Sequence, residues 1–173
     1  LKVLDEVLDG LATMHAAELG HLDLKPSNVV LRHGGEAVLV DFGLAGRHIR
    51  PGCTTGPYGA PEVWGVVPNG GRATPMRADV YAFGCLAFEA LTGRTLFAAD
   101  SEAAQIGMHL THDGQPPAVL ALSQRPGLGA LGSFLRACLR RSPKDRPTAT
   151  ELRAELAPLR TQLARQPWPL PMT

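Results

Sequence analysis

The spacing of apolar residues at the start of the chain predicts an amphipathic helix. These residues recur at intervals of three and four, which is the period of one helix face. They are Leu4, Leu8, Leu11, Met14 and Ala17. Gly20 follows them, and glycine commonly ends helices because it adopts a left-handed backbone at little steric cost. We therefore expect a helix that ends near Gly20, on which His15 is a surface or core residue rather than a ligand.

Two further apolar patterns predict a hairpin and a central helix. Residues 29–31 and 37–40 are short apolar runs separated by polar and glycine residues, as in a small hairpin. Residues 79–91 are apolar on nearly every side, as a helix in the middle of a core must be. Asp79 at the start of this stretch can accept backbone N–H groups, and Gly93 is expected to end the helix.

The last part of the chain is predicted to consist of helices joined by loops. We expect helices over residues 101–110 and 132–141. Thr148, with Glu151 three residues later, forms the sequence signature of a capping box for a last helix. Pro158 is expected to interrupt or kink that helix, because proline lacks the backbone N–H.

Two stretches rich in proline and glycine divide the chain. Residues 65–75 are predicted to form a loop, and residues 166–173, with three prolines, a tail or the start of a linker. The first stretch is expected to be a surface loop and the second to lie outside the fold, so we expect one domain over residues 1–165. A chain of 173 residues can bury about two thirds of its unfolded surface, which is enough for one sizeable core.

Charge and cysteine content exclude several classes of function. Seventeen Lys and Arg against sixteen Asp and Glu give a net charge of +1, so binding to nucleic acid or an acidic membrane is not indicated. No apolar run has membrane-spanning length. Cys53, Cys85 and Cys138 are odd in number and widely spaced, which argues against disulfides or a zinc site. A reducing compartment, and hence the cytoplasm, is the expected location. Because Leu1 lies within an apparent helix, we expect the chain to be part of a longer protein.

Four polar residues around the predicted hairpin suit phosphoryl transfer. Asp41 and Asn28 offer the carboxylate and amide oxygens that Mg²⁺ prefers. Asp23 can orient an acceptor hydroxyl and take its proton, and Lys25 can hold a phosphate as a compact point charge. Catalysis of phosphoryl transfer consists mostly of such placement of charges.

The motifs around these residues resemble a known family. His-x-Asp-Leu-Lys-Pro-x-Asn over residues 21–28, followed by Asp-Phe-Gly over residues 41–43, is similar to the catalytic and metal-binding loops of eukaryotic-type (Hanks-type) serine/threonine protein kinases. Residues 56–62, 79–84 and 144–147 match three further family motifs in the same order. Together these segments cover nearly the whole chain.

The resemblance implies a fold and a reaction. The fold would be the large C-terminal kinase lobe, mainly helical with a small hairpin at the catalytic site. The β-rich N-terminal lobe would be absent, because only 22 residues precede Asp23. The reaction would transfer the γ-phosphate of ATP, with Mg²⁺, to serine or threonine of a protein, as in signalling. The implied catalytic residues are Asp23, Lys25 and Thr55; the implied ATP-binding residues are Lys25, Asn28, Val30 and Asp41; the implied metal ligands are Asn28 and Asp41.

The resemblance also implies structural roles. His21 would pack under Phe42, Asp79 would tether the catalytic loop, and Glu62 would form a buried ion pair with Arg146. Leu22 stands where the family usually has an arginine that receives the phosphate of a phosphorylated activation loop. Leucine cannot do this, which argues against that form of control.

Two alternative functions fit the residues less well. A pseudokinase that works by contact alone would have no physical need for Asp23, Lys25, Asn28 and Asp41. A small-molecule kinase shares part of the loop spacing, but residues 60–62 and Arg146 argue against it.

Other candidate residues are interpreted as structural. Residues 127–132 match the glycine spacing of a nucleotide-binding loop, yet no strand precedes them and they follow the catalytic loop. His109 and His112 are predicted to be solvent-exposed rather than metal ligands, because no third ligand is near in sequence. Thr54 is predicted to be an ordinary loop residue.

Overall fold

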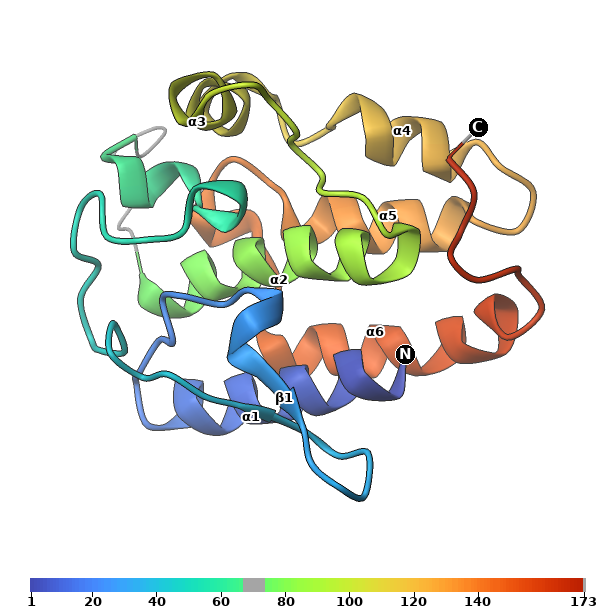
Figure 1. The fold of residues 1–173 in the computed structure, drawn as a ribbon, viewed down its shortest axis with the longest axis horizontal. Coiled ribbons are helices and arrows are strands. Elements are labelled where there is room, and N and C mark those ends of the chain that lie inside the picture. The colour runs from blue at the N-terminus through green and yellow to red at the C-terminus, as the bar shows by residue number, and fades with distance from the viewer. Residues whose placement is uncertain (67–73, 173) are drawn as a thin grey trace.

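A computed structural model describes residues 1–66 and 74–172, and it is mainly helical with one hairpin (Figure 1). The helices and strands are α1 (Lys2–Ala16), β1 (Val29–Leu31), β2 (Ala37–Leu39), α2 (Pro75–Thr92), α3 (Glu102–Thr111), α4 (Pro117–Ser123), α5 (Gly129–Cys138) and α6 (Ala149–Leu163). Short 3₁₀ turns lie at Pro26–Asn28, Gly56–Tyr58, Pro61–Trp64 and Pro143–Asp145. The predicted fold class is confirmed.

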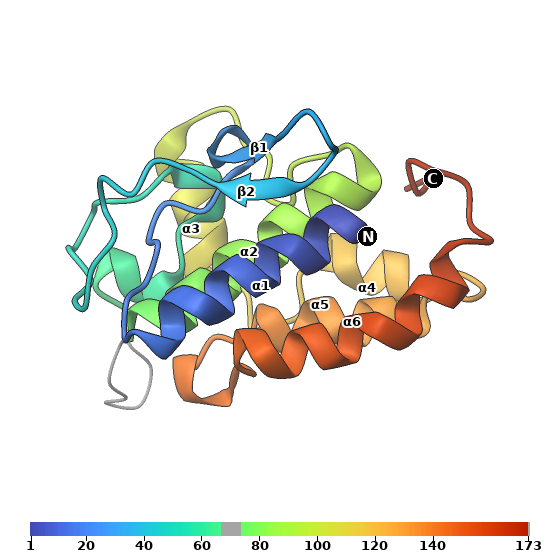
Figure 2. The same cartoon turned by 90° about the horizontal axis from the view of Figure 1, so that it is seen from below.

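The α2 helix forms the centre of the core, as its all-round apolar pattern predicts. Fourteen of its 18 residues are buried, so neighbours cover it on every side. It packs against α1 and α5, and α6 in turn packs against α1 and α5 (Figure 2). The helix begins at Pro75, whose fixed φ suits a first helical turn, and ends at Gly93 with a φ of 69°.

The hairpin lies against α1, close to the start of the chain. β1 and β2 pair antiparallel with Val30 opposite Val38. The backbone N–H of Ala37 donates to Glu6 Oε2 at 2.9 Å, which ties β2 to α1. Figure 2 shows the hairpin beside α1, on the side away from α6. The predicted hairpin is confirmed, although β2 ends at Leu39.

Gly20 has a different role from the predicted one. α1 ends at Ala16, and the N–H groups of Ala17 and Leu19 both donate to the Met14 carbonyl. Gly20 instead exchanges two backbone hydrogen bonds with Gly46, and a Cβ on it would lie 2.4 Å from the Pro75 Cβ. Glycine is therefore needed here for close packing.

The later helices form in the predicted regions of the chain, but some of them begin and end at other residues than predicted. α3 is capped by Ser101, and the Thr148–Glu151 capping box of α6 is confirmed. α5 begins and ends three residues before the predicted range. The short α4 was not predicted, because its brief apolar run has no clear period. Pro158 does not interrupt α6, which continues to Leu163 because its buried leucines hold it on the core.

Two predicted loops have different outcomes. The loop predicted over 65–75 falls mostly on residues 67–73, which lie outside the described residues, and Pro75 already belongs to α2. The tail beyond α6 packs on the core through Leu170, which is 3% exposed and whose N–H donates to the Leu91 carbonyl at 2.8 Å. Within the described part of the chain, no helix has the length and apolarity to cross a membrane.

Candidate active site

The loop that carries Asp23 is held by a buried carboxylate on α2. Asp79 Oδ2 accepts the N–H of His21 and Oδ1 accepts the N–H of Leu22, each at 2.7 Å. The Nε2 atom of His15 on α1 also lies 2.9 Å from Asp79 Oδ2. Leu22 adopts a positive φ of 64°, an uncommon conformation for leucine that these bonds help to hold. The predicted tether is confirmed, and Asp79 lies in the second turn of the helix.

Asp23, Lys25 and Thr55 form a closed hydrogen-bond triangle. Lys25 Nζ donates to Asp23 Oδ2 at 2.7 Å and to Thr55 Oγ1 at 2.9 Å. Thr55 Oγ1 donates to Asp23 Oδ1 at 2.7 Å. Asn28 Nδ2 joins them by donating to Asp23 Oδ2 at 3.2 Å and to the Asp23 carbonyl at 2.8 Å. Residues from two segments 30 positions apart thus meet at one carboxylate.

This environment keeps the Asp23 carboxylate ionised. Burial alone would raise its pKa, but hydrogen bonds from Lys25, Thr55 and Asn28 together with the Lys25 charge outweigh burial, and the pKa lies below its ordinary value. The stabilisation from the ionised group is therefore present above the unfolded pKa and lost as the pH falls through the folded one. At neutral pH the group can accept a hydrogen bond from a hydroxyl.

Asp41 lies next to this network but outside it. The N–H of Val40 donates to the Asn28 carbonyl at 3.0 Å, which brings Asp41 beside the end of the catalytic loop. Within the described residues, the Asp41 side chain bonds only the N–H of Gly43, at 3.3 Å. Asp41 is exposed and has a positive φ of 63°.

The oxygen atoms of Asn28 and Asp41 fit a hard cation. Across residues 1–66 and 74–172, neither Asn28 Oδ1 nor Asp41 Oδ2 accepts a hydrogen bond. The same residues contain no group of three or more His, Cys, Asp and Glu that would hold a metal ion alone. Two protein oxygens completed by phosphate oxygens is a common way to bind Mg²⁺.

His21 is a structural residue, as predicted. It is fully buried, and its ring lies 5.4 Å from that of Phe42 between centroids. Its Nε2 donates to the Val40 carbonyl at 3.1 Å, while Nδ1 accepts from the N–H of Asp23 at 3.4 Å. Both ring nitrogens are occupied, so the ring is unavailable to carry protons. Phe42 and Val30 are 55% and 44% exposed, which leaves an apolar surface beside Asp41.

The predicted ion pair between Glu62 and Arg146 is confirmed. The guanidinium bonds both carboxylate oxygens, at 2.5 and 2.9 Å, and neither side chain is exposed. Arg146 also donates to the carbonyls of Arg140, Arg77 and Arg141. The pair thus joins the segment after Thr55 to the start of α2 and to the loop before α6.

The prediction that His109 and His112 are exposed is wrong. His109 is fully buried, and both rings bond the hydroxyl of Tyr81 on α2. The sequence did contain a signal, because a tyrosine inside a buried helix needs a polar partner for its hydroxyl. Residues 127–132 form the turn before α5 and its first residues, where Gly132 packs closely against Ser123, which agrees with their interpretation as structural.

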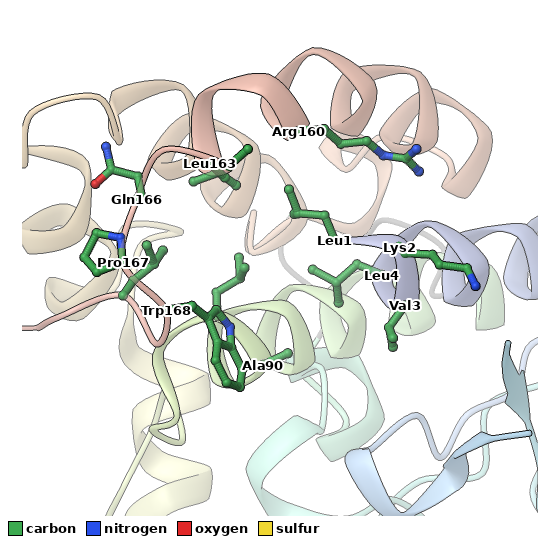
Figure 3. A pocket seen from close by; sticks show the side chains of 13 residues that line it. Leu1, Lys2, Val3, Leu4, Ala90, Arg160, Leu163, Gln166, Pro167 and Trp168 are labelled. Carbon is green, nitrogen blue, oxygen red and sulfur yellow. The ribbon is translucent and has the colours of Figure 1, made fainter. Parts of the chain in front are cut away.

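A separate pocket of about 680 Å³ lies between the start of α1, the end of α2, the end of α6 and the tail that follows α6 (Figure 3). Its lining is mostly apolar and includes Leu4, Leu163 and Trp168. Lys2 and Arg160 are its charged residues, and no carboxylate lines it. None of Asp23, Lys25 and Thr55 lines it, so it is separate from the hydrogen-bond triangle.

Comparison with known proteins identifies the family. A model described as a protein kinase domain matches residues 1–156. Serine/threonine-protein kinase PkaA of Streptomyces coelicolor is 35% identical over 157 residues, covering 85% of this chain and 27% of the relative. Serine/threonine-protein kinase Pkn1 of Myxococcus xanthus is 36% identical over 154 residues, covering 84% of this chain and 22% of the relative. Probable serine/threonine-protein kinase pknA2 of Bifidobacterium longum is 32% identical over 176 residues, covering 97% of this chain and 22% of the relative.

The chain spans about a quarter of the length of these relatives. Its helical core, its hairpin and the order of its motifs are those expected of the large kinase lobe. The chain therefore belongs to the protein kinase family, as a C-terminal lobe of the eukaryotic-type serine/threonine class.

Proposed function

We propose that the protein containing this chain transfers the γ-phosphate of ATP to serine or threonine hydroxyls of proteins. The observation that carries the proposal is the triangle of Asp23, Lys25 and Thr55. A carboxylate offers about four acceptor positions, and in Asp23 the hydrogen bonds from Lys25, Asn28 and Thr55 use three of them. One position on Oδ1 is left for a substrate hydroxyl, and the carboxylate is charged when it is needed.

The neighbouring residues suit a nucleotide with its metal. Mg²⁺ would be held by Asn28 and Asp41, and when bound it supplies positive charge against the phosphate oxygens. Lys25 would hold the transferring phosphate while it keeps its bond to Asp23. Val30, half exposed on β1, would contact the apolar face of the base. In this proposal the cytoplasm is the location of the reaction.

A pseudokinase is the second candidate. Such a protein would work by contact with partners, without catalysis. The intact triangle favours the active enzyme. A transfer assay with Mg-ATP on the protein together with its upstream coding sequence separates the two, because a pseudokinase would leave serine and threonine residues of any acceptor unlabelled.

The purified 173-residue chain should not transfer phosphate at an appreciable rate. The described residues form a helical core with one hairpin and contain no second lobe that would orient ATP over the proposed base and metal ligands. Orientation provides much of the catalysis of phosphoryl transfer. Radiolabelled ATP with a generic protein acceptor provides the measurement. Rapid labelling by the isolated chain would contradict this expectation.

Replacing Thr55 with alanine should lower kcat of the longer enzyme by about 10- to 100-fold, the usual effect of losing a hydrogen bond to a charged group. Thr55→Ser keeps the hydroxyl and should retain most of the activity. Thr54→Ala is the matched control, because Thr54 makes no side-chain hydrogen bond within the described residues. Equal activity of Thr55→Ala and Thr54→Ala would show that the triangle does not assist transfer.

A further inference from the structure

A cluster of three polar rings lies in the core, away from Asp23. The Tyr81 hydroxyl is 2.8 Å from His109 Nδ1 and 2.7 Å from His112 Nε2. Phe97 packs on both imidazoles, with centroid distances of 4.4 and 5.2 Å, and the Arg146 guanidinium lies 4.9 Å from the centre of the Tyr81 ring. Such an enclosed cluster must have a definite arrangement of protons, because each hydrogen bond needs one donor and one acceptor.

The backbone fixes the direction of these hydrogen bonds. The N–H of Gly114 donates to His112 Nδ1 at 3.0 Å, so this nitrogen carries no proton. Burial lowers the pKa of both His112 and His109 to about 4, so both rings are neutral near pH 7. The proton of His112 must then be on Nε2, which donates to the Tyr81 oxygen. Tyr81 in turn donates to His109 Nδ1, which leaves the proton of His109 on Nε2.

The helix α3, which carries the last donor of this series, packs against the Gly56–Tyr58 turn that follows Thr55. His109 Nε2 is buried and has no acceptor in hydrogen-bonding geometry within the described residues. The backbone of Gly56 and Pro57 nevertheless lies near enough to oppose the fall in the His109 pKa that burial causes. The turn is packed closely on α3, because a Cβ on Gly56 would lie 3.0 Å from Gln105 Oε1.

We infer that Gly114, His112, Tyr81 and His109 form a one-directional hydrogen-bond relay that fixes α3 on α2. Because α3 packs against the Gly56–Tyr58 turn, the relay positions that turn, and through it Thr55, for the protein acceptor. The inference rests on the proposed kinase function. Thr55 directly precedes the turn, and its hydroxyl bonds Asp23. His112 is therefore a positioning residue, which acts through Tyr81 and His109 and touches no reacting atom. The far side of the turn is held separately, by the Tyr58 hydroxyl, which donates to Glu89 Oε2 at 2.7 Å.

The direction of the relay can be tested on the 173-residue chain without any activity. Nitrogen-15 NMR of the imidazole rings distinguishes a proton on Nδ1 from one on Nε2. We expect the Nε2–H form for both His109 and His112, and we expect both rings to stay neutral at pH 6. A proton on His112 Nδ1, or a charged ring at that pH, would overturn the relay.

The positioning role is tested by kinetics of the longer enzyme. Tyr81→Phe removes both hydrogen bonds with little change of volume, and His112→Leu removes the first donor. Each should raise KM for the protein acceptor about tenfold, as expected for one lost hydrogen bond, and leave KM for ATP unchanged. His112→Gln, which can still donate to Tyr81, should restore the acceptor KM. The exposed His33, whose ring makes no hydrogen bond among the described residues, provides the control variant His33→Leu.

The possible failures are distinguishable. An unchanged acceptor KM in both variants, or equal changes of KM for ATP and acceptor, would refute the positioning role. Absence of phosphoryl transfer by the unmodified enzyme would refute the proposed function instead, and the NMR result would still decide the direction of the relay.

Discussion

Asp23→Ala should reduce kcat of the longer enzyme by about 10²- to 10⁴-fold, which is the usual contribution of a general base. The reason is geometric as well as electrostatic. Asp23 is the common partner of Lys25, Thr55 and Asn28, so its removal both deletes the proton acceptor and frees the groups around it. The measurement is initial-rate transfer of labelled phosphate at saturating ATP and acceptor.

The control separates catalysis from folding. Asp100→Ala removes an exposed carboxylate and should leave kcat unchanged. Asp23→Ala should also retain binding of ATP, because Asn28 keeps its hydrogen bond to the backbone carbonyl at position 23 and Asp41 lies outside the network. Turnover by Asp23→Ala equal to that of Asp100→Ala would exclude Asp23 as the base.

The sequence was sufficient to predict which residues lie together wherever one short motif determines the local geometry. Asp23, Lys25 and Asn28 lie within six positions, so one tight loop brings them together. The partners of this loop were also predictable, since Asp79 and Thr55 occupy fixed places in motifs that recur in the same order. Glu62 and Arg146 are 84 positions apart, and only the family resemblance, not spacing, indicated that they would meet.

The sequence was insufficient where packing between distant segments decides the outcome. The role of Gly20 depends on the approach of Pro75, 55 residues later, and no local pattern reveals such a contact. His109 and His112 looked like surface residues because histidine is polar. Instead, the Tyr81 hydroxyl needs polar partners in the core, and the two histidines, 28 and 31 residues later, provide them.

Arg146→Ala should lower the free energy of unfolding by about 3 to 5 kcal/mol, because it leaves the Glu62 carboxylate buried without its partner. It would also leave the carbonyls of Arg140, Arg77 and Arg141 without the donor they now share. For a domain of this size, a loss of that magnitude corresponds to a fall in Tm of roughly 6 to 20 °C. Urea denaturation of the 173-residue chain, followed by circular dichroism, measures the effect.

Burial, rather than ion pairing as such, should account for this loss. Arg153 bonds Asp5 at 3.1 Å and also Asp9, but its side chain is 43% exposed, so Arg153→Ala should lower the free energy of unfolding far less than Arg146→Ala does. The double variant Glu62→Leu with Arg146→Met should be more stable than Arg146→Ala, since it leaves no charge stranded. Equal losses for Arg146→Ala and Arg153→Ala would mean that water reaches Glu62 in the folded chain. The segment after Thr55 would then be less firmly held to α2 than the two hydrogen bonds between Glu62 and Arg146 imply.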